Sequence, residues 1–208
     1  VKASRGLGDV YKRQIEGSAK LVSPHELEVN GSLLSTKNIV IATGASPVIP
    51  PIPGLEDSAY STSDSIWKLR ELPKKLLVIG GGPIGCELAQ AFRRLGSEVT
   101  ILTRDPKVLP KEDRDLAELV LKNFESEGIQ MQTEVQVERI EKKNSEQQVY
   151  FRKDGVEQHI NADHILLATG RKPGTSGLGL KEVGVELNPD GTVKVDPFLR
   201  SSIPNIYA

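Results

Sequence analysis

Short apolar runs and amphipathic stretches alternate along the chain. The runs at residues 76–79 and 99–102 have the length and character of buried β-strands. Between them, apolar residues recur at helical spacing from Ile84 to Leu95, and Gly96 follows where a helix would end. The pattern therefore predicts a strand, a helix with Pro83 in its first turn and a second strand, in that order.

Further elements are expected on both sides of this unit. Short strands at 20–22 and 26–29, with turns at 23–24 and 30–31, predict a small β-meander that leads into a buried strand at 39–42. Downstream we expect a helix over 115–127, strands at 129–132, 135–142, 148–152 and 164–168, and a solvated hairpin tip at 141–146. Four residues of that helix form an apolar stripe expected to pack in the core: Leu116, Leu119, Val120 and Phe124.

A glycine-rich turn joins the first strand to the helix. Its six residues are Gly80, Gly81, Gly82, Pro83, Ile84 and Gly85. The spacing G-x-G-x-x-G is typical of dinucleotide-binding βαβ units, in which the first glycine permits the turn, the second admits a pyrophosphate and the third allows helix and strand to pack closely. A turn that binds nothing is the alternative, and the surrounding strand–helix–strand order favours the nucleotide site.

The phrase Ala-Thr-Gly follows an apolar run twice, at 42–44 and at 168–170. One copy precedes the glycine turn and the other follows it, which suggests that one domain is inserted into another. Prolines between residues 47 and 53 mark a stiff connection suited to a domain boundary. We therefore expect an α/β fold with a Rossmann-like dinucleotide-binding domain and a β-meander, inserted into a second domain.

Composition excludes several classes of function. The net charge of −1 argues against nucleic acid or an anionic membrane as a partner, and no apolar run is long enough to span a bilayer. Cys86 is the only cysteine, so no internal disulfide is possible, and the small thiol is expected to pack in the interior. The three histidines, His25, His159 and His164, have no ligand spacing, and no metal site is predicted.

Residues 1–14 differ in character from the remainder of the chain. Residues 9–14 match the translation of a transposase adapter used in sequencing libraries, and the segment lacks the apolar core of a signal peptide. We expect a non-native leader, with an ordinary basic N-terminal segment as the alternative. The final residues stop within a strand-like sequence, so a fragment of a longer protein is expected.

These motifs together resemble the FAD-dependent pyridine nucleotide-disulfide oxidoreductases, with phrases most similar to the mercuric reductase and dihydrolipoyl dehydrogenase branches. The resemblance covers residues 15–208. It implies that 15–51 are the end of a first FAD-domain segment, 52–171 an NAD(P)-binding domain, and 172–208 the start of the returning, truncated FAD segment. The FAD-binding domain would thus be incomplete, and the redox cysteine pair and dimerisation domain of the family would lie outside the chain.

The resemblance also implies cofactor contacts. Glu87 would lie on the first helical turn facing the nicotinamide, and this role is favoured over the alternative, a favourable placement of an acid near a helix N-terminus. Val137 and Gly170 would line the adenine and nicotinamide sides of the NAD(P) site. Three further residues would approach FAD: Ala19, Thr43 and Gly44. No residue of the chain is assigned a catalytic role.

The end of the second strand predicts the choice of nicotinamide cofactor. An acidic residue about 20 positions beyond the glycine motif would hold the ribose 2′-hydroxyl of NAD. Here Thr103 occupies that position and Arg104 follows, and an arginine can pair with the 2′-phosphate of NADP. NADP(H) is therefore favoured over NAD(H), with a solvated surface arginine as the alternative and Lys107 as a second phosphate contact.

The resemblance implies a fragment of a flavin-dependent NAD(P)H oxidoreductase. Hydride would move between NAD(P)H and FAD, and then to a cysteine pair and a small-molecule disulfide, dithiol or metal-ion substrate. Two alternatives remain open, a non-catalytic nucleotide-binding sensor and a flavin NADH dehydrogenase without redox cysteines. The parent protein is expected to be a cytoplasmic homodimer, and the fragment alone is expected to be inactive.

Overall fold

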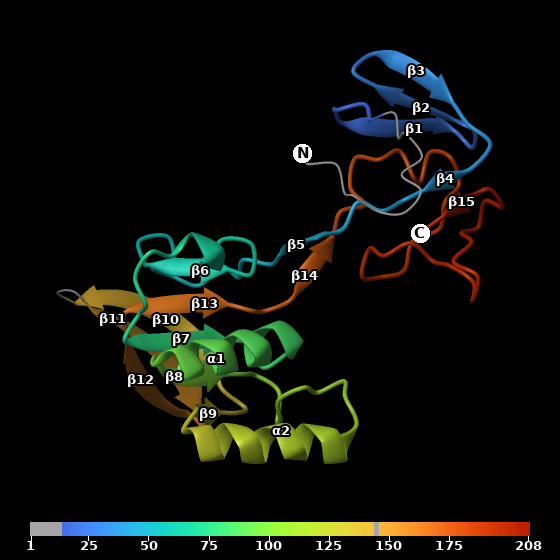
Figure 1. The fold of residues 1–208 in the computed structure, drawn as a ribbon. Helices are drawn as coiled ribbons and strands as arrows, with labels where there is room; N and C mark the ends of the chain where they lie inside the picture. Colours follow the sequence, from blue (N-terminus) through green and yellow to red (C-terminus); the bar gives the residue numbers. More distant parts are fainter. Residues whose placement is uncertain (1–13, 144–145) are drawn as a thin grey trace. The chain divides into compact units, whose positions relative to one another are not determined.

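The largest sheet of the structure has five strands that run parallel to one another (Figure 1). Their order is β6 (Tyr60–Thr62), β13 (His164–Leu167), β7 (Lys75–Ile79), β8 (Glu98–Leu102) and β9 (Gln130–Gln132). Because all five run in one direction, their carboxyl ends meet at one edge of the sheet, where open α/β sheets bind ligands.

This computed structural model describes residues 14–143 and 146–208. The chain divides into two units, Ser46–Lys172, here called the central unit, and the flanking unit formed by the residues up to Ala45 together with Pro173–Ala208. Most of the predicted leader, and residues 144–145 of the predicted hairpin tip, lie outside the described residues.

Two helices follow β7 and β8 and belong to the central unit. Helix α1 (Pro83–Leu95) begins at Pro83 and is capped by Gly96 in the left-handed region, with φ 114°, which confirms the predicted helix and its end. Helix α2 (Arg114–Glu127) ends similarly at Gly128, with φ 76°. A short 3₁₀ helix, η1 (Ile66–Lys68), precedes β7. Neither α-helix has the length and apolar character that a membrane crossing requires.

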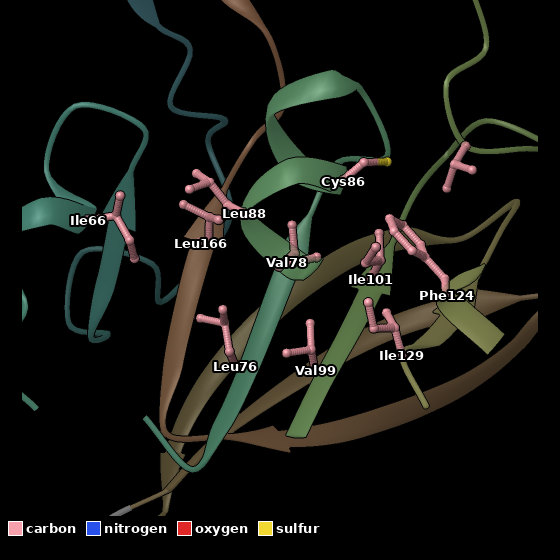
Figure 2. Close-up of a cluster of buried hydrophobic side chains, with 12 residues drawn as sticks. Ile66, Leu76, Val78, Cys86, Leu88, Val99, Ile101, Phe124, Ile129 and Leu166 are labelled. Atoms are coloured by element: carbon pink, nitrogen blue, oxygen red, sulfur yellow. The ribbon is translucent and has the colours of Figure 1, made fainter. Parts of the chain in front are cut away.

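The two helices pack on one face of the sheet. Figure 2 shows the cluster of buried side chains on this face. Val78 of β7, Ile101 of β8 and Leu166 of β13 point toward them and are fully buried. Leu88 of α1 and Phe124 of α2 complete this cluster from the helices. We call it the helix-side core. The alternate strand residues point to the other face, which explains why these strands are continuous apolar runs.

The other face is covered by an antiparallel meander of β10 (Gln136–Lys143), β11 (Glu146–Lys153) and β12 (Val156–Ala162). Val149 and Phe151 of β11 pack with Leu77, Leu102 and Leu167 of the sheet in a second core cluster. The sequence did not predict β12, because most of its side chains are exposed and supply almost no apolar alternation.

The expectation for α2 is wrong in part. Leu116 and Leu119 were expected in the core but are 56% and 57% exposed. The helix face that meets the sheet is centred on Ala117 and Phe124, which are buried, and Leu119 points away from that face because of the 3.6-residue period.

The flanking unit contains a second, smaller set of strands. An antiparallel sheet is formed by β1 (Ala19–Ser23), β2 (Glu26–Val29) and β3 (Ser32–Ser35), and β4 (Ile39–Val40) pairs in parallel with β15 (Ile206–Tyr207). The predicted buried strand at 39–42 is wrong in extent, since β4 has two residues and Val40 is 70% exposed. Where the chain passes between the units lie β5 (Ala45–Pro47) and β14 (Arg171–Pro173), which form a two-stranded sheet.

His164 and Ser61 form a polar contact within the main sheet. The two residues lie on the neighbouring strands β13 and β6, and His164 Nε2 is 2.9 Å from Ser61 Oγ. Burial lowers the pKa of His164 below its ordinary value, because the charged imidazolium loses solvation there.

This burial predicts a pH-dependent stability. Because the pKa of His164 is lower in the folded chain than in the unfolded one, acid protonates the unfolded chain first, so the contribution present above about pH 6.5 is lost as the pH falls. We expect the free energy of unfolding of wild type to decline more between pH 7.5 and 5.5 than that of His164→Gln, measured by urea titration and Trp67 fluorescence. The exposed His159 supplies the control, His159→Gln, which should follow wild type. Equal declines in wild type and His164→Gln would contradict this prediction.

Candidate functional site

A cleft of about 750 Å³ opens at the carboxyl edge of the main sheet, entirely within the central unit. The glycine turn after β7 lines it, together with the segments that follow β8 and β13, the start of β10 and the proline-rich segment after β5. Eight of the residues predicted from the sequence line it: Gly80, Gly81, Gly82, Pro83, Thr103, Arg104, Val137 and Gly170.

The first glycine of the turn is required by both its backbone and its surroundings. Gly80 has φ 119°, a conformation that L side chains rarely adopt. A Cβ added there would lie 2.2 Å from the main-chain oxygen of Ala168, at the end of β13. The turn therefore lies directly against the backbone of the neighbouring strand.

The third glycine allows the helix to pack against the turn. A Cβ added to Gly85 would lie 2.1 Å from Gly80 O and 3.3 Å from the Ala168 side chain. Gly85 is buried and does not line the cleft. Its role is thus the close helix–strand contact that the motif predicts.

The second glycine has no such internal explanation. Gly82 has φ −78° and ψ 179°, which any residue can adopt, and a Cβ added to it would meet no protein atom within 4 Å. The open space lies on the cleft side of the turn, at the N-cap of α1, where main-chain N–H groups have no partner within the helix. A glycine at this position fits a ligand that must approach the backbone closely, such as the pyrophosphate of a dinucleotide.

Thr103 and Arg104 lie at the end of β8 but differ in environment. Thr103 is 4% exposed, and its Oγ1 accepts a hydrogen bond from the Asp105 N–H at 3.3 Å, so its hydroxyl is used locally. Arg104 is exposed at the cleft, and within the described ranges no ion pair joins it to a carboxylate. Its guanidinium therefore remains available to an anionic ligand.

Other predicted residues lie elsewhere. Ile84 packs against the helix-side core. Glu87 is the fifth residue of α1 and is exposed; it does not line the cleft, and the expectation that it lies in the first helical turn is wrong, because the helix begins at Pro83. Lys107 does not line the cleft either.

Sequence reasoning missed several residues of the cleft wall. Lys111 and Glu112 line it from the loop after β8, and Thr169 and Val48 line it beside the glycine turn, where Thr169 Oγ1 donates to Val48 O at 2.9 Å. Lys111 carries the same charge as Arg104, but nothing in its sequence spacing distinguishes it from other lysines of a charged loop. The second Ala-Thr-Gly phrase was the available signal for Thr169.

The predicted FAD contacts belong to the flanking unit. Ala19 begins β1, while Thr43 and Gly44 lie between β4 and β5, and all three are exposed. Gly44 has φ 66°, so its backbone alone accounts for the glycine, and the ligand argument made for Gly82 does not apply to it.

Cys86 is not a reactive thiol in this structure. Its side chain is 5% exposed, and burial, with a smaller effect from Glu87, raises its pKa to about 11. The thiol is therefore protonated at neutral pH and is not a nucleophile. In the part of the chain that the structure describes, no group of three or more His, Cys, Asp or Glu side chains could hold a metal ion.

The second and third glycines predict different effects of the same substitution on stability. Gly85→Ala should lower the free energy of unfolding by about 2 kcal/mol, because the new methyl group overlaps Gly80 O. Gly82→Ala should change it by less than about 1 kcal/mol, since its backbone and surroundings accept a Cβ. Urea unfolding followed by fluorescence of Trp67, the only tryptophan, measures both variants. Equal destabilisation by the two would show that Gly82 has a packing role.

Comparison with known proteins agrees with this geometry. The sequence model of the family described as pyridine nucleotide-disulphide oxidoreductase matches residues 5–208. The chain is 41% identical over 194 residues to mercuric reductase of Lysinibacillus sphaericus, covering 93% of the chain and 36% of that protein. It is 37% identical to dihydrolipoyl dehydrogenase of Thermus scotoductus, covering 93% of the chain and 42% of that protein.

A solved structure is similar as well. The HOCl-induced flavoprotein disulfide reductase RclA from Escherichia coli superposes with a TM-score of 0.79 at 35% identity, covering 93% of this chain and 44% of that one. The chain thus spans less than half the length of these relatives. The match to the family sequence model and the shared Rossmann-like fold establish that the chain belongs to the pyridine nucleotide-disulfide oxidoreductase family.

Proposed function

We propose that this chain supplies the NAD(P)H-binding part of a flavin-dependent oxidoreductase. The observation that carries the proposal is Gly82, a glycine that neither backbone conformation nor packing requires, facing open space at a helix N-terminus within a large cleft. A dinucleotide pyrophosphate at this position would receive main-chain N–H groups and the favourable end of the helix dipole.

The residues of the cleft would divide the cofactor between them. Gly80, Gly81, Gly82 and Pro83 would form the pyrophosphate cradle, with Ile84 and Gly85 holding the start of the helix behind it. Val137 would line the adenine side and Gly170 the nicotinamide side. Glu87, although it does not line the cleft, would face the nicotinamide end from the second turn of α1.

The bound cofactors would supply the redox chemistry, a hydride passing between the nicotinamide and a flavin. In the flanking unit, Ala19, Thr43 and Gly44 would approach FAD. The electrons would then reach a cysteine pair and a small-molecule disulfide, dithiol or metal ion, in keeping with relatives named mercuric reductase, dihydrolipoyl dehydrogenase and glutathione reductase. Buried Cys86 cannot serve as that pair, so the cysteines would belong to other parts of the whole protein, which we propose to be a cytoplasmic homodimer.

We further propose that NADP(H) is preferred over NAD(H). Arg104 is exposed at the cleft with no carboxylate partner in the described ranges, and Lys111 adds a second positive charge to the same wall. Thr103 cannot replace the acidic residue that binds the 2′-hydroxyl of NAD, because its hydroxyl is buried and hydrogen-bonded to the Asp105 N–H.

The pyrophosphate assignment is tested by binding. Wild type should enhance NADPH fluorescence on titration, and Gly82→Ala should weaken the affinity by at least about tenfold, because the methyl group would occupy the space of the phosphate while leaving the fold intact. The unfolding measurement on the same variant separates lost binding from lost structure. Unaltered affinity in a folded Gly82→Ala would refute the proposed site, and no binding to wild type would refute the proposed function.

The cofactor preference is tested by the ratio of NADPH to NADH affinity. Arg104→Ala should reduce this ratio by about tenfold, the effect of one charge-assisted contact to a phosphate. Arg114→Ala is the matched control, because Arg114 is an exposed arginine that pairs with Glu118 and does not line the cleft. If both variants retain the wild-type ratio, Arg104 is a solvated surface residue.

A further inference from the structure

The main-chain oxygen of Gly81 is held by donors from two separate elements. The N–H of Leu109, in the loop after β8, donates to Gly81 O at 2.7 Å. The thiol of Cys86, on the first turns of α1, donates to the same oxygen at 3.5 Å. Cys86 belongs to the buried cluster between the sheet and the helices (Figure 2), and its high pKa keeps it in the donor form at neutral pH.

This arrangement determines the direction of the next N–H group. The described chain contains no cis peptide bond, so the C=O of Gly81 and the N–H of Gly82 point in opposite directions across one planar peptide. Because the oxygen is held by Leu109 and Cys86, the N–H of Gly82 must point away from both of these donors. The Gly82 oxygen is likewise occupied, because it accepts the Cys86 N–H at 3.0 Å in the first hydrogen bond of α1.

The orientation matters because a phosphate is an anion. A carbonyl oxygen directed at it would repel it, whereas an N–H donates a charge-assisted hydrogen bond. Glycine peptides rotate easily, since glycine occupies positive and negative φ with similar ease. The consecutive glycines 80–82 therefore need an external constraint to keep one orientation.

Leu109 donates this hydrogen bond from an uncommon backbone conformation. It has φ 49°, one of a few non-glycine residues in the left-handed region. The loop holds it there on both sides, since Val108 is fully buried in the helix-side core and the Leu109 oxygen accepts the Glu112 N–H at 3.0 Å. The same loop carries Arg104 and Lys111 to the cleft wall.

We propose that Leu109 is a positioning residue for dinucleotide binding, whose left-handed main chain, assisted by the Cys86 thiol, holds the Gly81–Gly82 peptide with its N–H toward the pyrophosphate. The inference rests on the proposed function and goes beyond the glycine motif, because the residue that orients the phosphate donor lies in a different loop. It also couples the wall that would select NADP(H) to the turn that would bind the pyrophosphate.

Leu109→Val tests the proposal. A β-branched residue strongly disfavours the left-handed region, so the loop should leave this conformation and the N–H should no longer reach Gly81 O. Leu109→Asn is the conservative variant, because asparagine has nearly the shape of leucine and readily adopts that conformation. Leu199→Val is the matched control, since Leu199 has φ 62° but belongs to the flanking unit.

NADPH titration supplies the first measurement. We expect Leu109→Val to weaken NADPH affinity roughly fivefold, the value of one hydrogen bond, while Leu109→Asn and Leu199→Val stay within about twofold of wild type. The second measurement is the amide proton of Gly82 in the ¹⁵N-labelled chain. In wild type and Leu109→Asn it should shift downfield on addition of NADPH, and in Leu109→Val this shift should be reduced.

A Gly82 amide that responds to NADPH equally in wild type and Leu109→Val, with equal affinities, would overturn the proposal while leaving the proposed function in place. Equal weakening by Leu109→Val and Leu109→Asn would also overturn it, because the side chain and not the backbone would then be responsible. If wild type neither binds NADPH nor shows a shift at Gly82, the proposed function and this inference fail together.

Discussion

The arrangement of the central unit depends on one constraint, the close contact between main-chain segments at the glycine turn. The end of β7, the start of α1 and the end of β13 converge there, and the positions of Gly80 and Gly85 leave no room for a side chain between them and the oxygens of Ala168 and Gly80. This close approach brings the N-terminus of α1 to the carboxyl edge of the sheet. The cleft exists because the helix begins at that edge, against the turn.

The two layers on the sheet support this arrangement from opposite sides. The helices bury one set of alternate residues of β7, β8 and β13, and the meander buries the other set, so the apolar side chains of all three strands are inaccessible to water. Such strands are fixed in register by packing on both faces. The loops at their carboxyl ends are free of that requirement, which is why polar and charged groups such as Arg104 and Lys111 can be placed there.

Local spacing made part of the site predictable. Rules that act within one turn of the chain identify the glycine motif, the proline in the first helical turn and the glycine cap at Gly96. The structure confirms the helix between Pro83 and Gly96. Val137 and Gly170 were placed at the nucleotide site by resemblance, and both line the cleft.

Lys111 and Leu109 could not be identified, because their relevance depends on how the loop after β8 folds back onto Gly81. Strand β12 was missed for a related reason, since its pairing with β11 is stabilised by the main chain and leaves few apolar side chains in the pattern.

By itself, the sequence determined the α/β class, the βαβ unit and the position of its glycine turn, because hydrophobic periodicity and glycine spacing are local properties of the chain. Only the tertiary structure decided which residues share the cleft and which face of α2 is buried, Phe124 being inside and Leu119 outside. It also decided that the oxygen of Gly81 accepts the N–H of Leu109. These outcomes depend on contacts between segments that are distant in sequence, and a hydrogen bond such as that from Leu109 to Gly81 forms only when both segments have been placed by the packing of the core.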